Sequence, residues 1–158
     1  MKIKKNQNLK RGLTLVELSV VVLILGAIIA IVAFNINPKE LQWKVAKLKL
    51  QKDGQSLSAS LEQYQSEFGK LPTEEQGMRA LVEKPTGGEV PENYKPVVKS
   101  KKDILDPWKT EYRLRFDSNG DYSIISLGKD GKEGGEGMNK DFNILKEDEF
   151  PSEAVKEK

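Results

Sequence analysis

The sequence KRGLTLVEL, residues 10–18, opens a long apolar stretch that continues to Phe34. As a helix, residues 13–34 would be about 33 Å long, which matches the roughly 30 Å hydrocarbon core of a bilayer. Glu17 is the single charged residue between Leu13 and Phe34. A carboxylate at this depth costs on the order of 3 kcal/mol in lipid, so we expect a cation to pair with it.

The N-terminal leader carries the chain's excess of positive charge. Residues 1–12 contain five basic side chains and no acid, whereas the whole chain of 158 residues has a net charge of +2. The remainder is therefore net acidic, which excludes the broad basic surface of a nucleic-acid-binding protein. Cysteine and histidine are both absent. The absence of cysteine excludes disulfides, thiol nucleophiles and thiolate metal sites, and no motif indicates an enzyme.

Three interpretations of this N-terminus compete. A cleaved secretory signal has an apolar core of about 7–15 residues and a small-x-small cleavage site. The apolar stretch here is longer, and Ala27, Ala30 and Ala33 are spaced so that no Ala-x-Ala occurs. A permanent transmembrane anchor fits the length, with the basic flank on the cytoplasmic side. The third interpretation is processing between Gly12 and Leu13, and the residues alone do not decide between the second and the third.

A second helix is expected after the apolar stretch. Residues 35–38, Asn-Ile-Asn-Pro, interrupt the helical pattern, because Pro38 lacks a backbone donor. The pattern resumes at Lys39 and runs to Phe68. Two apolar stripes lie on different faces of this helix: Leu41, Val45 and Leu48, then Leu50, Leu57, Leu61, Tyr64 and Phe68. Gly69 is a suitable C-cap, and Pro72 blocks further helix.

Short elements are expected beyond this helix. Thr73 and Gln76 have the spacing of a capping box at the start of a short helix. Alternating residues 112–116, a turn and a second strand at 122–127 predict a β-hairpin. The apolar side chains expected inside are Met78, Leu81, Val82, Tyr94 and Trp108. A small antiparallel sheet packed on the amphipathic helix follows, which is an α+β fold.

Residues 127–141 form an acidic segment rich in glycine. Its charge excludes a phosphate cradle, because the acids would repel the anion. Calcium takes six to eight oxygen ligands, and glycines let backbone carbonyls turn inward. The oxygens available come from the Leu127 carbonyl and the side chains of Asp130, Asn139 and Asp141. The spacing does not match an EF-hand, so the residues alone favour a solvated loop over a metal site.

Four strings together resemble the type IV pilin-like superfamily, and most closely the major pseudopilins of type II secretion, the protein G family. They are Lys10-Arg11-Gly12 followed by LTLVE, the Pro-Thr-x-x-Gln-Gly string at residues 72–77, Asp-Pro-Trp at 106–108, and SLGKDGKEGGEG at 126–137. The resemblance extends from Lys10 to about Asn143. Leu13 departs from the phenylalanine usual in the family, and Lys109 from the usual glycine.

The resemblance implies a set of site residues. A prepilin peptidase would cut after Gly12 and methylate the new amino group of Leu13. Glu17 would then pair with that amino group on a neighbouring subunit of a helical filament. The resemblance also makes calcium the ligand of the acidic loop. The calcium ligands it implies are Leu127 through its carbonyl, Asp130, and, near the end of the loop, Asn139 and Asp141.

The implied fold is α+β and pilin-like, with a long helical spine packed on a small antiparallel sheet. It would comprise a cleaved leader (1–12), a transmembrane and filament-core helix (13–37), a periplasmic domain (38–145) and a charged, disordered tail (146–158). The implied function is a structural subunit, not an enzyme. Copies would leave the inner membrane and form the periplasmic filament that helps export folded proteins across the outer membrane.

Several partners follow from the same resemblance: further copies of the chain, minor pseudopilins, the prepilin peptidase and methyltransferase, and the inner-membrane assembly platform. The alternative is a type IV pilin for adhesion or motility. Such pilins often close a C-terminal loop with a disulfide, which this chain cannot form because it has no cysteine.

Overall fold

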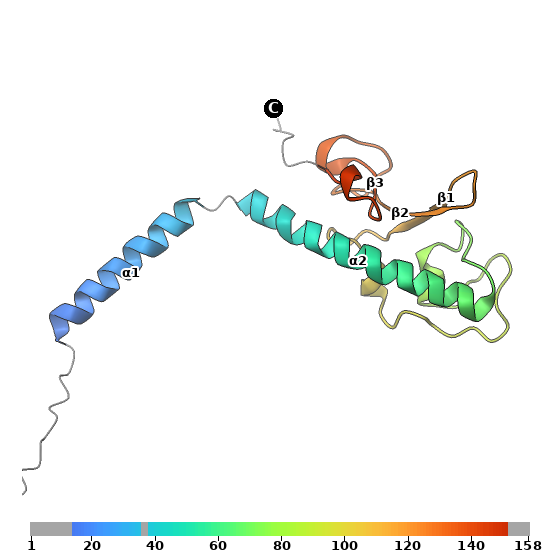
Figure 1. Ribbon diagram of the computed structural model, residues 1–158, viewed down its shortest axis with the longest axis horizontal. Helices are drawn as coiled ribbons and strands as arrows, with labels where there is room; N and C mark the ends of the chain where they lie inside the picture. Colours follow the sequence, from blue (N-terminus) through green and yellow to red (C-terminus); the bar gives the residue numbers. More distant parts are fainter. Residues whose placement is uncertain (1–13, 36–37, 152–158) are drawn as a thin grey trace, which may run out of the picture. The chain divides into compact units, whose positions relative to one another are not determined.

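The computed structural model describes residues 14–35 and 38–151, and the chain divides after Leu41 into two compact units. Its N-terminal half consists of two helices, α1 (Leu15–Asn35) and α2 (Pro38–Phe68), which are labelled in Figure 1. The predicted interruption falls between them, and residues 36–37 lie outside the described part. Helix α2 begins at Pro38 itself, because proline is tolerated in the first turn, where its missing N–H has no partner to lose.

Helix α1 is apolar on all sides. Residues Leu15–Phe34 are long and apolar enough to cross a membrane. Every described side chain from Thr14 to Phe34 is exposed to solvent in the isolated chain. Burial within the chain therefore does not account for this apolar surface, and lipid or other protein must cover it.

Helix α2 contributes one side of the core. Its second predicted stripe is buried: Leu50, Leu57, Leu61 and Tyr64 are at most 2% exposed, and Phe68 packs against them. Trp43 and Ala46 extend this buried stripe toward the start of the helix. The first predicted stripe behaves differently, because Leu41, Val45 and Leu48 remain exposed.

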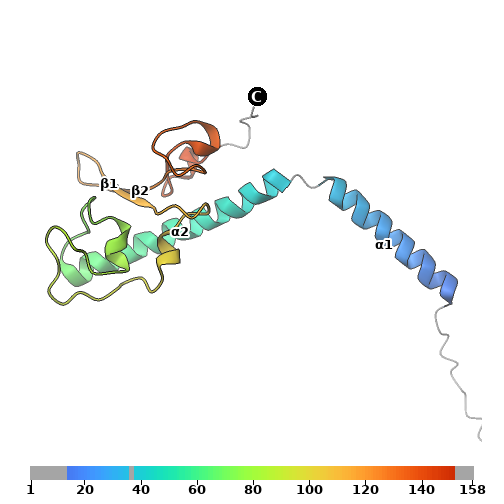
Figure 2. The ribbon, with the colours of Figure 1, turned by 180° about the vertical axis from the view of Figure 1, so that it is seen from behind.

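A three-stranded antiparallel sheet forms the second layer, in the order β1 (Arg113–Phe116), β2 (Tyr122–Ser126) and β3 (Phe142–Asn143). The predicted hairpin is confirmed, with Arg113 opposite Ile125 and Phe116 opposite Tyr122. Figures 1 and 2 show the sheet along one side of α2, with the segment between α2 and β1 around the end of the helix. Leu114 and Ile124 face the helix and complete the α+β core.

The segment between α2 and β1 contains two short 3-10 helices, η1 (Met78–Leu81) and η2 (Lys101–Ile104). The predicted capping box is confirmed. The Thr73 backbone N donates to Gln76 Oε1 at 3.1 Å, and the Gln76 backbone N donates to Thr73 Oγ1 at 3.2 Å. Of the side chains expected inside, Met78 and Leu81 are fully buried, while Val82, Tyr94 and Trp108 are half-buried against the core.

The start of the predicted disordered tail is folded. Residues Glu147–Glu149 form a further 3-10 helix, η4, and the Asn143 backbone N donates to Glu149 Oε2 at 3.2 Å. Phe150 follows, and its ring lies 5.4 Å from that of Phe142. Composition alone missed this aromatic contact, which anchors a charged segment. Residues 152–158 of the predicted tail lie outside the described part.

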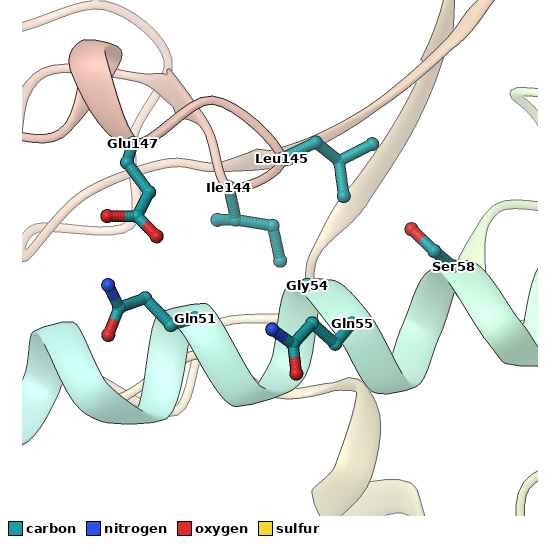
Figure 3. A pocket seen from close by; sticks show the side chains of 7 residues that line it. All are labelled: Gln51, Gly54, Gln55, Ser58, Ile144, Leu145 and Glu147. Carbon is teal, nitrogen blue, oxygen red and sulfur yellow. The ribbon is translucent and has the colours of Figure 1, made fainter.

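Gly54 lets the segment after β3 approach α2 closely. A Cβ at this buried position would lie 3.0 Å from the Ile144 carbonyl oxygen, which is backbone and cannot rotate away. Figure 3 shows Ile144 and Leu145 above the helix at this point. Glycine within a helix costs about 1 kcal/mol relative to alanine. The close approach of the two backbones explains why glycine occupies this position.

We expect Gly54→Ala to lower the free energy of unfolding by about 1–2 kcal/mol despite its better helix propensity. The reason is the contact between the new methyl group and the Ile144 carbonyl. Thermal and chemical denaturation of the full chain would measure the change, with the exposed neighbour substitution Gln55→Ala as the control. A variant at Gly54 that is more stable than the parent would contradict the close approach.

Candidate functional site

The N-terminus of α1 is closed by a capping box. The Thr14 backbone N donates to Glu17 Oε2 at 3.0 Å, and Thr14 Oγ1 lies 3.1 Å from the same oxygen. In return, the Glu17 backbone N donates to Thr14 Oγ1 at 3.2 Å. The Thr-x-x-Glu spacing before an apolar run was a detectable signal for this box. Gly12 and Leu13, the predicted cleavage and methylation residues, lie outside the described part.

The acidic glycine loop connects β2 to β3, and its two ends lie against each other. The Lys129 backbone N donates to the Met138 carbonyl at 2.9 Å. Gly128 has a φ of +68°, and a Cβ there would lie 2.7 Å from the Asn139 carbonyl carbon. A Cβ at Gly135 would lie 2.5 Å from the Asn139 carbonyl oxygen. The backbone around Asn139 is thus enclosed by two glycines that no other residue could replace without displacement.

The four predicted metal ligands belong to this loop. Leu127 is buried at its start, and Asn139 is half-buried where the two ends meet. Asp130 is exposed, and its Oδ1 accepts a hydrogen bond from the Lys132 backbone N at 3.1 Å. Asp141 Oδ2 accepts from the Gly134 backbone N at 3.0 Å. The structure therefore brings Gly128, which follows Leu127, close to Asn139, and a hydrogen bond ties Asp141 to Gly134 across the loop.

Asp141 has one carboxylate oxygen with no partner. Its Oδ1 is buried and makes no hydrogen bond within the chain. Among the described residues, no three acidic side chains come together as a metal cluster. Calcium also uses backbone carbonyl and amide oxygens, so the mixed set of carbonyl, amide and carboxylate oxygens in this loop fits its chemistry.

Asp106 joins the start of this loop to the neighbouring turn. It is 3% exposed, and its Oδ1 accepts hydrogen bonds from the backbone N of Trp108 at 2.9 Å and of Thr110 at 2.8 Å. Its Oδ2 accepts from Ser126 Oγ at 2.9 Å, and Ser126 Oγ accepts from the Gly128 backbone N at 3.3 Å. Burial raises the pKa of Asp106, and these hydrogen bonds oppose the increase. No role for Asp106 was predicted from the sequence, although the Asp-Pro pair indicates a turn.

Lys109 follows this turn in a strained conformation. Its φ is +72°, and among the described residues it is the one non-glycine residue with a positive φ. A side chain with a Cβ costs about 1–2 kcal/mol in this left-handed region. The Lys109 backbone N donates to the Asp106 carbonyl at 3.1 Å, which helps hold the residue in place.

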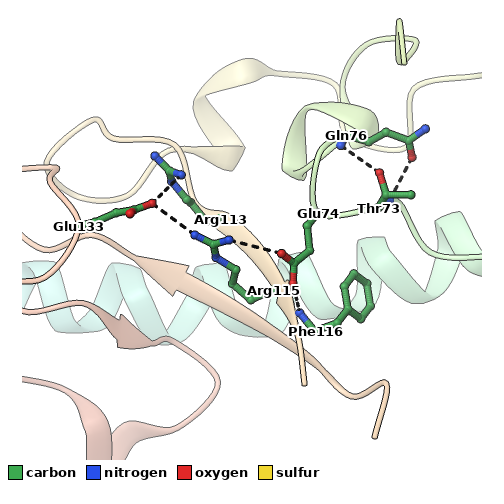
Figure 4. A network of polar contacts seen from close by, with 7 residues as sticks. All are labelled: Thr73, Glu74, Gln76, Arg113, Arg115, Phe116 and Glu133. Atoms are coloured by element: carbon green, nitrogen blue, oxygen red, sulfur yellow. Dashed lines mark hydrogen bonds and ion pairs between the residues drawn. The ribbon is translucent and has the colours of Figure 1, made fainter. Parts of the chain in front are cut away.

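An ionic network supports the loop from the other side (Figure 4). Glu133 Oε1 accepts from Arg113 at 3.0 Å and from Arg115 at 3.3 Å. Arg115 also donates to Glu74 Oε2 at 3.4 Å. Glu74 Oε1 accepts from the Phe116 backbone N at 2.6 Å, and this hydrogen bond lowers the pKa of Glu74. The arginines thus neutralise Glu133, which therefore serves the loop as an anchor to β1.

Comparison with known proteins identifies the family. The model for type II secretion system (T2SS) protein G matches residues 39–144, which is more than half of the chain. The chain belongs to this family. Related core proteins G occur in Pseudomonas aeruginosa, 39% identical over 78% of this chain and 87% of the relative, and in Vibrio cholerae, 37% identical over 87% and 93%.

A solved structure agrees with the assignment to the protein G family. The crystal structure of the major pseudopilin from the type 2 secretion system of enterohaemorrhagic Escherichia coli matches with a TM-score of 0.55 and 32% identity. The match covers 68% of this chain and 93% of that one. The α+β, pilin-like fold predicted from the sequence is thereby confirmed.

We expect Lys109→Gly to raise the free energy of unfolding by about 0.5–1 kcal/mol, because glycine adopts a φ of +72° without a Cβ clash. The matched control is Lys109→Ala, which removes the charge and keeps the Cβ. Urea denaturation of the three proteins would measure the difference. An equal gain from glycine and alanine would show that the lysine side chain, and not its backbone conformation, is responsible.

Proposed function

We propose that this protein G is a structural subunit that polymerises into the periplasmic pseudopilus of a type II secretion system and helps export folded proteins. The observation that carries the proposal is the fully exposed apolar surface of α1. Such a helix is stable only when lipid or other subunits cover it. Storage in the inner membrane followed by stacking of α1 helices in a filament supplies both environments. Membership of the protein G family favours this secretion filament over a type IV pilin.

The proposed maturation gives Glu17 its partner. Cleavage after Gly12 creates a free amino group on Leu13, which the peptidase then methylates. In the filament this ammonium group would pair with Glu17 of an adjacent copy. Each charge alone is costly in an apolar surrounding, and the pair offsets much of that cost. The capping box with Thr14 supports this role, because it holds the carboxylate at the very start of the helix.

The proposed orientation follows from the charge of the leader. Residues 1–12 are basic, and basic flanks remain cytoplasmic. Helix α1 would cross the inner membrane once, and the second unit would lie in the periplasm. The proposed partners are further copies of the chain, minor pseudopilins, the prepilin peptidase and methyltransferase, and the inner-membrane assembly platform.

Calcium is the cofactor we propose for the acidic glycine loop. Leu127 through its carbonyl, Asp130, Asn139 and Asp141 would hold it. The unpartnered Oδ1 of Asp141 supports the proposal, because a buried acceptor without a partner is destabilising by about 1–3 kcal/mol. When bound, the cation supplies positive charge to the loop. Glu133 would remain outside the site, since Arg113 and Arg115 already neutralise it.

Two substitutions at Glu17 test the filament proposal. Glu17→Ala removes the charge and the capping box, whereas Glu17→Gln removes the charge and keeps a capping residue. If the charge pair drives assembly, both variants should insert in the membrane and form filaments at least tenfold less abundantly than the parent. Electron microscopy of sheared filaments would measure this, and mass spectrometry of the membrane pool should show chains starting at methylated Leu13.

Full assembly of Glu17→Gln would assign the role of Glu17 to helix capping alone. Chains that retain Met1 in assembled filaments would contradict the proposed processing.

Calcium removal tests the proposed metal site. We expect chelation to lower the melting temperature of the full chain in detergent by several degrees, because a ligand at 100 times its Kd adds about 2.7 kcal/mol to stability. Asp130→Asn and Asp141→Asn should lose this response. The control Asp148→Asn, an exposed acid outside the loop, should keep it. Identical melting curves with calcium and with chelator would refute the site.

A further inference from the structure

The first turns of α2 carry an apolar stripe that its own fold leaves uncovered. Leu41, Val45 and Leu48 are 53%, 60% and 67% exposed. Their spacing of four and three residues puts them on one face of the helix. The residues between them that point the other way, Trp43 and Ala46, are 8% exposed and belong to the core. The stripe is therefore a second, outward apolar face on a helix that already has an inward one.

Positive charge accompanies this stripe. Residues 40–53 contain four lysines and two acids, Glu40 and Asp53, and are therefore net positive. Lys44 lies three residues after Leu41 and four before Leu48, and Lys52 lies four residues after Leu48, so both lysines border the stripe. Lys49 pairs with Asp53, and its Nζ also donates to the Leu105 carbonyl at 2.6 Å. An apolar stripe bordered by lysines is the pattern of a helix that lies in a membrane interface.

The position in the chain fits the same pattern. Leu41 comes a few residues after Phe34, where the candidate membrane span ends. Those few residues limit how far the stripe can be from the membrane surface, whatever the angle between the helices. We propose that the lysine-bordered stripe Leu41–Val45–Leu48 binds the surface of the membrane that holds α1, with the exposed Lys52 at the phosphates of anionic lipids. This inference rests on the proposed anchoring of α1.

Self-association through the same stripe is disfavoured by charge and area. Pairing two copies of the stripe would bring their lysines together, and like charges in contact are destabilising. Three side chains also bury far less than the roughly 800 Å² per partner of a stable protein interface. Anionic lipid offers the opposite charge together with an apolar layer a few ångströms below it. Contact with another face of a second copy is left as an outcome of the test.

The absence of cysteine allows single fluorescent labels to test the stripe. Leu48→Cys reports on the stripe, and Ala59→Cys is the matched control, exposed on the same helix face three turns farther along. The full chain would be placed in nanodiscs at one copy per disc, with phosphatidylethanolamine and phosphatidylglycerol. Lipids with a nitroxide near the headgroup should quench the label at position 48 at least twofold more than the label at position 59. Lys52→Glu or high salt should remove most of this difference.

Each alternative result overturns the proposal in a distinct way. Equal quenching at positions 48 and 59 would show that the stripe does not bind lipid. Equal quenching in discs of neutral phosphatidylcholine would remove the role of anionic headgroups. Protection of position 48 only in discs with two copies would assign the stripe to a protein contact. Release of the chain from the discs at alkaline pH would refute the anchoring of α1, and the lipid contact with it, before any label is read.

Discussion

An apolar helix that its own chain does not cover is the constraint on which the rest of this structure depends. Residues Leu15–Phe34 have no polar face, and every one of their side chains is exposed in the isolated chain. The hydrophobic effect over this surface is far larger than the stability of a small domain. The helix must therefore be covered by lipid or by other protein.

The carboxylate of Glu17 has one partner in the structure and a second in the proposed filament. In the isolated chain, Glu17 accepts the hydrogen bonds of Thr14 and completes a capping box. The same arrangement fixes the carboxylate at the helix terminus, where the exposed backbone N–H groups favour negative charge. In the proposed filament, a carboxylate placed there would meet an ammonium group from another chain. Capping and the proposed pairing are therefore compatible, and Glu17→Gln, which removes the charge and keeps a capping residue, separates them.

The sequence was sufficient for features set by local chemistry. Proline, glycine and periodicity located both helices, and the Thr73–Gln76 spacing predicted a capping box that the structure contains. Contacts between residues that lie far apart in the sequence could not be predicted from it. Nothing local revealed that Asp106 binds Ser126, or that Arg115 links Glu74 to the acidic loop. The exposed stripe was found as a pattern, but its exposure depends on which face the sheet covers, and periodicity does not contain that information.

The buried carboxylates of the second unit differ in whether the chain itself supplies their hydrogen-bond partners. Asp106 is buried with three hydrogen bonds to its carboxylate, so the chain itself satisfies the carboxylate that it buries. The loop ends are enclosed by Gly128 and Gly135, which fixes the backbone around Asn139. Asp141 differs from Asp106, since its Oδ1 is buried without a partner. In a chain without disulfides, the cation proposed at this oxygen would stabilise the loop, and the stability of the loop would then depend on the metal in its surroundings.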